Sequence, residues 1–309
     1  MSTADVVVLA LVTGTHAATW GAFKDAPFEG FKVVSFVRTL ALAVVTATIL
    51  ATATDLETTL SPVVLVGVLY AIERLATEGW KSFLREDDQS AYSIPMRVAV
   101  RGRTVDGRGP RYLTGLVVLA TGGLVTWATS VLQPDAGGPW WLLVTVGGIG
   151  GWLTAAGGAW KDAPVEGFSG WKFLRSPVVA TSWAVLLLPF TQDWVALTVS
   201  AAGLSVLSIE TYKTFFTGGR PPGKFEGKPQ RPAPQRDRCR QLHAAAYTGL
   251  ACVAGLTALS DATAGPARGT IQLLAFTVVA SAMALLIGCR PSERRPSVRR
   301  TLAADAVPS

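Results

Sequence analysis

The sequence has few charged residues and few side chains that bind soft metals. Only 16% of its 309 residues are charged and 50% are hydrophobic, whereas about 25% charged is usual in soluble domains. Two histidines and three widely spaced cysteines exclude a His-rich metal site, a zinc knuckle and a disulfide framework. The scarcity of charge, with a mean hydropathy of +0.37, indicates a polytopic membrane protein.

Nine apolar stretches are long enough, at about 20 residues each, to cross a bilayer as helices. Two of them, 39–54 and 176–192, are short, and their helices are expected to continue into the flanking residues. The fold class is therefore an all-α polytopic membrane protein with about nine transmembrane helices. The predicted spans are 5–23, 39–54, 60–80, 112–132, 139–160, 176–192, 194–213, 242–260 and 269–289.

The basic residues are distributed unevenly between the connections. Of 28 Lys and Arg, 27 fall in alternate connections and in the C-terminal tail, and the other connections hold only Arg268. The positive-inside rule then predicts an N-terminus outside and a cytoplasmic C-terminus in a multi-pass cell-membrane protein. The first span lacks a preceding basic residue, so we do not expect a cleaved signal peptide. The net charge of +7 is mainly an orientation signal, and no nucleic-acid partner is expected.

Two motifs occur twice in the chain. The segment GAFKDAPFEGF at 21–31 recurs as GAWKDAPVEGF at 158–168, at an offset of 137, and Arg38 recurs as Arg175 at the same offset. The segment EGWKSF at 78–83 recurs as ETYKTF at 210–215, at an offset of 132. We name these the KDAPxEGF and ExΦKxF blocks, where Φ is aromatic. They predict two parallel four-helix repeats at 1–132 and 133–260, an additional helix in 261–289 and a disordered cytoplasmic tail at 290–309.

The KDAPxEGF blocks have two interpretations. In the structural one, Asp25 caps a helix, Pro27 lies in its first turn, and a short amphipathic helix follows at the membrane interface. In the functional one, the acids of both copies gather in one cleft, because charge near hydrocarbon is costly and is kept for a purpose. The candidate catalytic residues are Asp25, Glu29, Asp162 and Glu166. The same four, with Glu78 and Glu210, are candidate ligands of a hard divalent cation, Mg²⁺.

Basic side chains near these acids supply the opposite charge. Their ordinary role is to form salt bridges and to contact lipid headgroups, and their alternative role is to bind a phosphate or diphosphate. The candidate phosphate-binding residues are Lys24, Lys161, Arg38, Arg175, Lys81 and Lys213. This combination at a cytoplasmic surface favours a phospholipid, polyprenyl-phosphate or nucleotide-linked substrate, with membrane lipids as partners.

A few further residues inside the predicted spans have expected roles. Glu73 is a candidate site residue because it is an intramembrane carboxylate, and its neighbour Arg74 is expected on a different helix face. His16 is expected to donate a hydrogen bond between packed helices, because its counterpart in the second repeat is Leu153. The glycines of 147–158 have the spacing that suits close helix contact. The loops 85–111 and 217–240 are expected to be solvated and to determine the orientation, with capture of anionic lipid or polyphosphate as the alternative.

Two DxxxE blocks in a nine-helix protein resemble the two Asp-rich motifs of the UbiA prenyltransferases. The resemblance is limited to Asp25, Glu29, Asp162 and Glu166. The blocks follow the first and fifth spans rather than the second and sixth, Glu replaces the second Asp, and the N-terminal asparagine-containing motif is absent. We therefore use the resemblance as an analogy for the chemistry and do not assign the chain to that family.

Three functions remain open from the sequence. The favoured one is a divalent-cation-dependent transferase acting on a lipid phosphate or polyprenyl diphosphate at the cytoplasmic face. The alternative is a transporter or channel built from pseudo-twofold repeats. The third is a non-catalytic lipid-binding or assembly protein, in which the repeated blocks only shape the fold.

Overall fold

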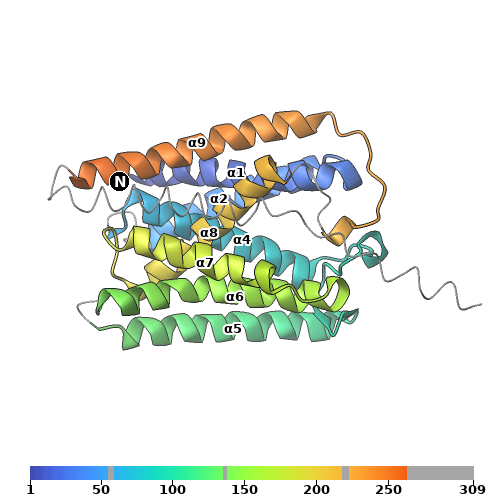
Figure 1. The fold of residues 1–309 in the computed structure, drawn as a ribbon, viewed down its shortest axis with the longest axis horizontal. Helices are drawn as coiled ribbons and strands as arrows, with labels where there is room; N and C mark the ends of the chain where they lie inside the picture. Colours follow the sequence, from blue (N-terminus) through green and yellow to red (C-terminus); the bar gives the residue numbers. More distant parts are fainter. Residues whose placement is uncertain (55–58, 135–137, 218–222, 263–309) are drawn as a thin grey trace, which may run out of the picture.

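The computed structural model is all-helical and describes residues 1–54, 59–134, 138–217 and 223–262. Its eight α-helices run back and forth along one direction (Figure 1). The predicted ninth span at 269–289 and the tail at 290–309 lie outside the described residues. The helices are α1 (Thr3–Glu29), α2 (Val33–Ala53), α4 (Pro62–Gly79), α5 (Arg108–Leu132), α6 (Trp140–Glu166), α7 (Gly170–Leu187), α8 (Trp194–Phe216) and α9 (Gln235–Ala262).

Five of these helices, α1, α2, α5, α6 and α8, are long and apolar enough to cross a membrane. Large apolar side chains are exposed along their outer surfaces, for example Leu119 and Trp127 on α5 and Trp152 and Leu153 on α6. Contiguous apolar surface of this kind is unfavourable in water and is typical of helices that contact lipid. These features are those of a membrane protein.

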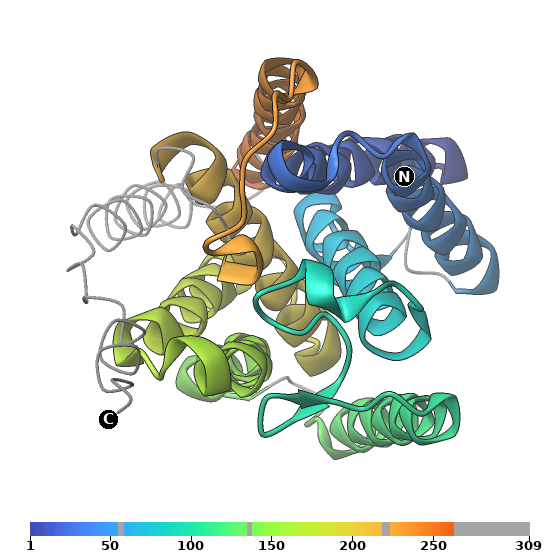
Figure 2. The same cartoon turned by 90° about the vertical axis from the view of Figure 1, so that its right-hand side faces the viewer.

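Helices α4 and α8 lie between the α1–α2 pair and the α6–α7 pair (Figure 2). They cross closely at two glycines. A Cβ atom at Gly67 would lie 2.7 Å from Cα of Ser200, and one at Gly203 would lie 2.9 Å from the backbone nitrogen of Ala71. Residues Val63–Ala71 of α4 are all buried, which explains why this segment is apolar on every face.

The α1–α2 and α6–α7 pairs also cross at glycines. A Cβ atom at Gly14 would lie 2.9 Å from Cβ of Ala43, and one at Gly151 would lie 2.6 Å from Cβ of Ala180. The predicted role of the glycine-rich part of α6 in close helix contact is confirmed for Gly147, Gly148, Gly150 and Gly151, where an added Cβ would meet α7 or α8. It does not extend to Gly157 and Gly158, which have open space.

The structural interpretation of the KDAPxEGF block as the start of a helix is wrong. The block forms the last turn of α1, with Pro27 inside the helix, and Gly30 ends it with a φ of 77° while its amide donates to the carbonyl of Ala26 at 3.0 Å. In the second copy Gly167 ends α6 with a φ of 82°. Glycine at these positions permits a backbone conformation that other residues rarely adopt. The next helix begins at once, at Val33, so no separate amphipathic helix precedes it.

We call the end of the bundle where α1, α4, α6 and α8 finish the loop end; it faces the viewer in Figure 2. The connection from α4 to α5 forms a π-helical turn η1 (Trp80–Leu84), a short helix η2 (Gln89–Ala91) and two antiparallel strands, β1 (Ala99–Val100) and β2 (Arg103–Thr104), paired as Ala99 with Thr104 and Val100 with Arg103. The connection from α8 to α9 contains a short helix η3 (Gly223–Phe225).

These two connections, predicted to be solvated, pack on each other instead. Phe225 of η3 stacks on Phe28 of α1, with ring centroids 4.5 Å apart, and lies 5.8 Å from the ring of Tyr92. The amide of Ser93 donates to the carbonyl of Lys224 at 2.7 Å. The aromatic contacts and this hydrogen bond hold the two connections together at the end of the bundle.

Candidate functional site

The repeated charged residues all lie toward the loop end, where α1, α4, α6 and α8 finish, but they form separate groups rather than one cluster. One group is centred on Arg74 of α4, and a second surrounds a cavity between α6, α7 and α8. A third consists of Asp25 and its neighbours at the end of α1.

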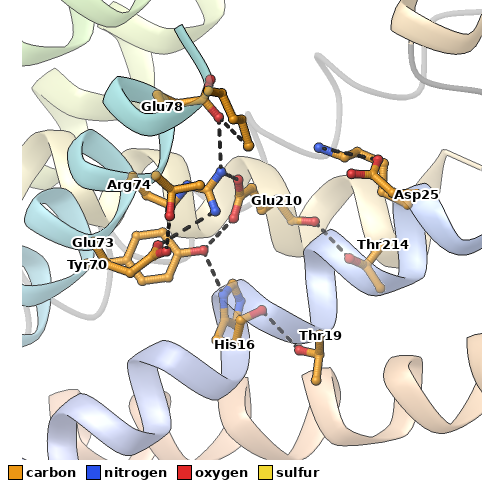
Figure 3. A network of polar contacts seen from close by, with 12 residues as sticks. His16, Thr19, Asp25, Tyr70, Glu73, Arg74, Glu78, Glu210 and Thr214 are labelled. Atoms are coloured by element: carbon orange, nitrogen blue, oxygen red, sulfur yellow. Dashed lines mark hydrogen bonds and ion pairs between the residues drawn. The ribbon is translucent and has the colours of Figure 1, made fainter. Parts of the chain in front are cut away.

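Arg74 is surrounded by three carboxylates (Figure 3). Its guanidinium nitrogens lie 3.6 Å from Glu73, 3.5 Å from Glu78 and 3.6 Å from Glu210. We expected Arg74 and Glu73 to lie on different faces of the helix. Their charged groups are nevertheless in contact, because the long arginine side chain reaches back to the carboxylate of Glu73. Arg74 thereby connects α4 to α8, since Glu210 is on α8.

A chain of hydrogen bonds extends from Glu210 into the bundle. The hydroxyl of Tyr70 donates to Glu210, and Nδ1 of His16 lies 2.9 Å from the same hydroxyl oxygen. Nε2 of His16 lies 2.7 Å from Oγ1 of Thr211. Because the Tyr70 proton points to Glu210, the tyrosine oxygen accepts from His16, which assigns the proton of the neutral imidazole to Nδ1. Thr211, His16 and Tyr70 therefore all donate in the direction of the Glu210 carboxylate.

The two histidines of the chain lie together. Their ring centroids are 3.9 Å apart, both side chains are fully buried, and Nδ1 of His243 lies 3.1 Å from the carbonyl oxygen of His16. The predicted role of His16 in joining packed helices is confirmed by its bonds to α4 and α8. The sequence singled out His16, Glu73 and Glu210 of this network but not Tyr70, Thr211 or His243.

A cavity of about 220 Å³ lies between the ends of α6, α7 and α8. We call it the α6–α7–α8 cavity. Apolar and small residues form part of its wall, including Ala155, Gly158, Phe173, Val206 and Ile209. Its charged lining residues are Asp162, Lys172, Arg175, Glu210 and Lys213. Four of these five belong to the set of residues that recur in both halves of the sequence.

The acids of this cavity have charged partners, whereas Arg175 and Lys213 form no ion pair with any residue that the structure describes. Nζ of Lys172 lies 2.9 Å from Asp162 and 2.7 Å from Glu166, and Glu210 is engaged by Arg74 and Tyr70. Within the described part of the chain, Nε of Arg175 is buried without a hydrogen-bond partner and Lys213 forms no ion pair. The cavity therefore has two cationic groups whose charge no carboxylate of the described residues neutralises by direct contact.

The acids at the corresponding positions of the first half are neutralised by lysines and Arg74, whereas Arg38, like Arg175, has a buried Nε without a hydrogen-bond partner among the described residues. Asp25 lies 2.8 Å from Lys224 of η3 and 3.8 Å from Lys24, while Glu78 lies 2.7 Å from Lys81. Burial lowers the pKa of Lys224 to about 8, although Asp25 opposes that shift. Lys224 is only 9% exposed, so the connection from α8 to α9 places a buried cation directly beside Asp25.

The remaining predicted site residues lie close to these groups. Glu29 pairs with Lys32, Arg38 lies over the ring of Trp80 at 5.5 Å, and Lys161 contacts the sulfur of Met96 at 3.5 Å. Glu166 lies against Gly223, beside the lysine that pairs with Asp25. The two KDAPxEGF blocks thus meet at η3.

No group of three or more His, Cys, Asp or Glu side chains that could hold a metal ion occurs in the part of the chain that the structure describes. The six acids predicted as magnesium ligands pair with different cations: Asp25 with Lys224, Glu29 with Lys32, Glu78 and Glu210 with Arg74, and Asp162 and Glu166 with Lys172. The assignment of Mg²⁺ to them stays a prediction.

Comparison of the chain with protein-family models, with curated proteins and with solved structures found no match.

Proposed function

We propose that the chain is built from two parallel four-helix repeats with the loop end in the cytoplasm and a ninth span after α9. Two observations support the repeat. Helices α1 and α6 have 27 residues each and are offset by the same 137 positions as the KDAPxEGF blocks. The contacts of Gly14 with Ala43 and of Gly151 with Ala180 are related by that offset. The positive-inside rule supports the orientation, since the loop end carries most of the basic residues.

We further propose that the α6–α7–α8 cavity binds the phosphate of a membrane lipid. The observation that carries this proposal is the pair of unneutralised cations, Arg175 and Lys213. A cation that is partly buried without a counter-ion is unfavourable, and phosphate oxygens accept strong charge-assisted hydrogen bonds from arginine and lysine. The apolar part of the wall, and exposed Trp171 and Phe168 beside it, favour a ligand whose phosphate is attached to a hydrocarbon chain.

The proposed activity is group transfer on that lipid phosphate with the help of a divalent cation. Asp162 and Glu210 are the two repeated acids in the wall of the cavity. Since Glu210 is engaged by Arg74 and Tyr70, Asp162 is the one that would hold Mg²⁺ against a bound phosphate. A non-catalytic lipid-binding protein would use the same cations without turnover. Both versions require the binding step, and that step is tested first.

Replacing Arg175 or Lys213 by glutamine is expected to weaken the binding of dioctanoyl phosphatidic acid about 10- to 100-fold, because each removes a charge-assisted hydrogen bond. Isothermal titration of the detergent-purified protein measures the affinity. Arg103→Gln, which removes an exposed positive charge from β2 at the same end, is the control for general electrostatic attraction and should bind as the wild type does.

Inorganic phosphate is titrated in parallel. We expect it to bind more weakly than the lipid, since it cannot use the apolar wall. Equal affinities of wild type, Arg175→Gln and Lys213→Gln for the lipid would contradict the proposed site.

The hydrogen-bonded chain favours a second candidate, a proton-coupled transporter of a phosphate-bearing solute. Thr211, His16 and Tyr70 connect the buried histidines to Glu210, which lines the cavity. In proteoliposomes, uptake of radiolabelled inorganic phosphate driven by a pH gradient is then expected, and His16→Leu, which introduces the residue of the second repeat, should abolish the coupling. Wild-type vesicles that take up no phosphate or glycerol phosphate under a pH gradient would exclude this candidate.

A further inference from the structure

The same Glu and Lys, three positions apart, are paired in one half and separate in the other. Glu78 and Lys81 form an ion pair at 2.7 Å. Glu210 and Lys213 have the identical spacing in the equivalent ExΦKxF block, yet Lys213 forms no ion pair within the described residues. Lys81 lies in the π-helical turn η1, whereas Lys213 lies in the regular α-helix α8. The two glutamates also differ in the groups that contact them from other parts of the chain.

Both carboxylate oxygens of Glu210 are engaged by α4. Oε1 lies 3.6 Å from Arg74, and Oε2 accepts the hydroxyl proton of Tyr70; Figure 3 shows both groups approaching Glu210 from the side of α4. The side chain is 9% exposed, so it has little freedom to turn toward solvent or toward Lys213. The carboxylate is therefore held on the side of α4, and the ammonium group of Lys213 is left in the wall of the cavity.

The second half offers no equivalent groups in return. At the offset of the ExΦKxF blocks, Tyr70, Glu73 and Arg74 correspond to Ala202, Ser205 and Val206. The side chains that make the polar contacts with Glu210 therefore belong to α4 and have no counterpart in α8. The repeated residues are the same in both halves, but the charged groups around them differ. In the first half Lys224 and Lys81 neutralise Asp25 and Glu78.

We propose that Arg74, which is outside the cavity wall, is a positioning residue that makes the α6–α7–α8 cavity an anion site by holding Glu210 away from Lys213. This inference rests on the proposed phosphate-binding function and deepens it. One half binds the ligand, and the other half supplies the arginine that creates the site. The expected stoichiometry is one phosphate per chain.

The two unneutralised positive charges in the cavity also specify the class of ligand. Arg175 and Lys213 provide two unneutralised positive charges, whereas Lys172 is already matched by two carboxylates. A phosphate monoester, which has a second ionisation near pH 6 and approaches two negative charges above it, matches two cations better than a phosphodiester with one negative charge. We therefore expect phosphatidic acid to bind at least tenfold more tightly at pH 7 than phosphatidylglycerol of the same chain length.

The test exchanges the residues of α4 for those at the equivalent positions of α8. Glu73→Ser with Arg74→Val removes one acid and one base, so the net charge is unchanged. Released from Arg74, Glu210 is expected to pair with Lys213 as Glu78 does with Lys81, and the affinity for dioctanoyl phosphatidic acid should fall at least tenfold. Adding Glu210→Gln to this double variant removes the competing carboxylate and should restore the affinity, a rescue that general structural damage would not allow.

The outcomes separate the two proposals. If the wild type binds, Arg175→Gln does not, and the double variant binds as tightly as the wild type, then the role of Arg74 is refuted and the phosphate site stands. If the wild type does not bind, the phosphate site itself fails. Should the double variant not fold, as judged by size-exclusion chromatography and thermal unfolding, Tyr70→Phe takes its place. It frees one oxygen of Glu210 and should weaken binding severalfold, with unchanged affinity overturning the proposal.

Discussion

Replacing Gly203 by alanine is expected to destabilise the folded protein by about 3 kcal/mol, the upper end of the usual cost of overpacking. A Cβ atom there would overlap the carbonyl oxygen of Gly67 and lie 2.9 Å from the backbone nitrogen of Ala71. These are backbone atoms, which cannot rotate away as a side chain can, so α4 and α8 must separate along their crossing. Reversible unfolding of the detergent-solubilised protein in sodium dodecyl sulfate, followed by circular dichroism, measures the loss.

Gly157→Ala is the matched control on another helix. Nothing lies within 4 Å of a Cβ atom at Gly157 of α6, and alanine favours the helix over glycine by about 1 kcal/mol. This variant should therefore be as stable as the wild type or more stable. Similar losses for Gly157→Ala and Gly203→Ala would show that the close crossing of α4 and α8 does not limit stability.

Arg74→Val alone is expected to destabilise the protein by about 3–5 kcal/mol, the range found when one partner of a buried ion pair is removed. It leaves Glu73 and Glu210 without their guanidinium partner, and their side chains are only 2% and 9% exposed. The same unfolding assay measures the effect. Arg108→Leu is the control, because this arginine is 73% exposed and pairs with Glu86 at the surface, where ion pairs contribute little.

A second substitution tests whether unpaired charge causes that loss. Adding Glu73→Ser to Arg74→Val removes one of the stranded carboxylates, so the double variant should be more stable than Arg74→Val alone. The double-mutant cycle is expected to give a coupling energy of about 1–2 kcal/mol between the two positions. Strictly additive effects would mean that Arg74 acts through packing rather than through its charge.

The positions of the helices follow closely from the apolar stretches. The predicted spans 60–80 and 194–213 correspond to α4 (Pro62–Gly79) and α8 (Trp194–Phe216). The ends nearest the KDAPxEGF blocks were predicted less well, since α1 continues to Glu29 rather than ending near residue 23. Charged residues and a proline mark the end of the apolar run. The helix nevertheless continues through Pro27, which removes one backbone hydrogen bond, and it ends at Gly30.

The location of the candidate site was also accessible from the sequence, because repeated charges in a chain with so few of them mark where the fold retains polar groups. The partners of those charges were not. Lys224 reaches Asp25 across 199 positions, and Arg74 reaches Glu210 across 136. No pattern of spacing predicts contacts of this length, since they depend on how loops fold back and how helices cross.

The two ExΦKxF blocks show the difference between what the sequence determines and what the tertiary structure decides. The sequence by itself determined that the chain is apolar and helical, that its basic residues gather in alternate connections, and that Glu78 with Lys81 and Glu210 with Lys213 recur at the same spacing. Only the tertiary structure decided which glutamate pairs with its lysine. An ion pair forms with the nearest competing charge in three dimensions, and close packing of α4 against α8 places Arg74 and Tyr70 next to Glu210, so that one lysine is neutralised and the other remains in the wall of a cavity.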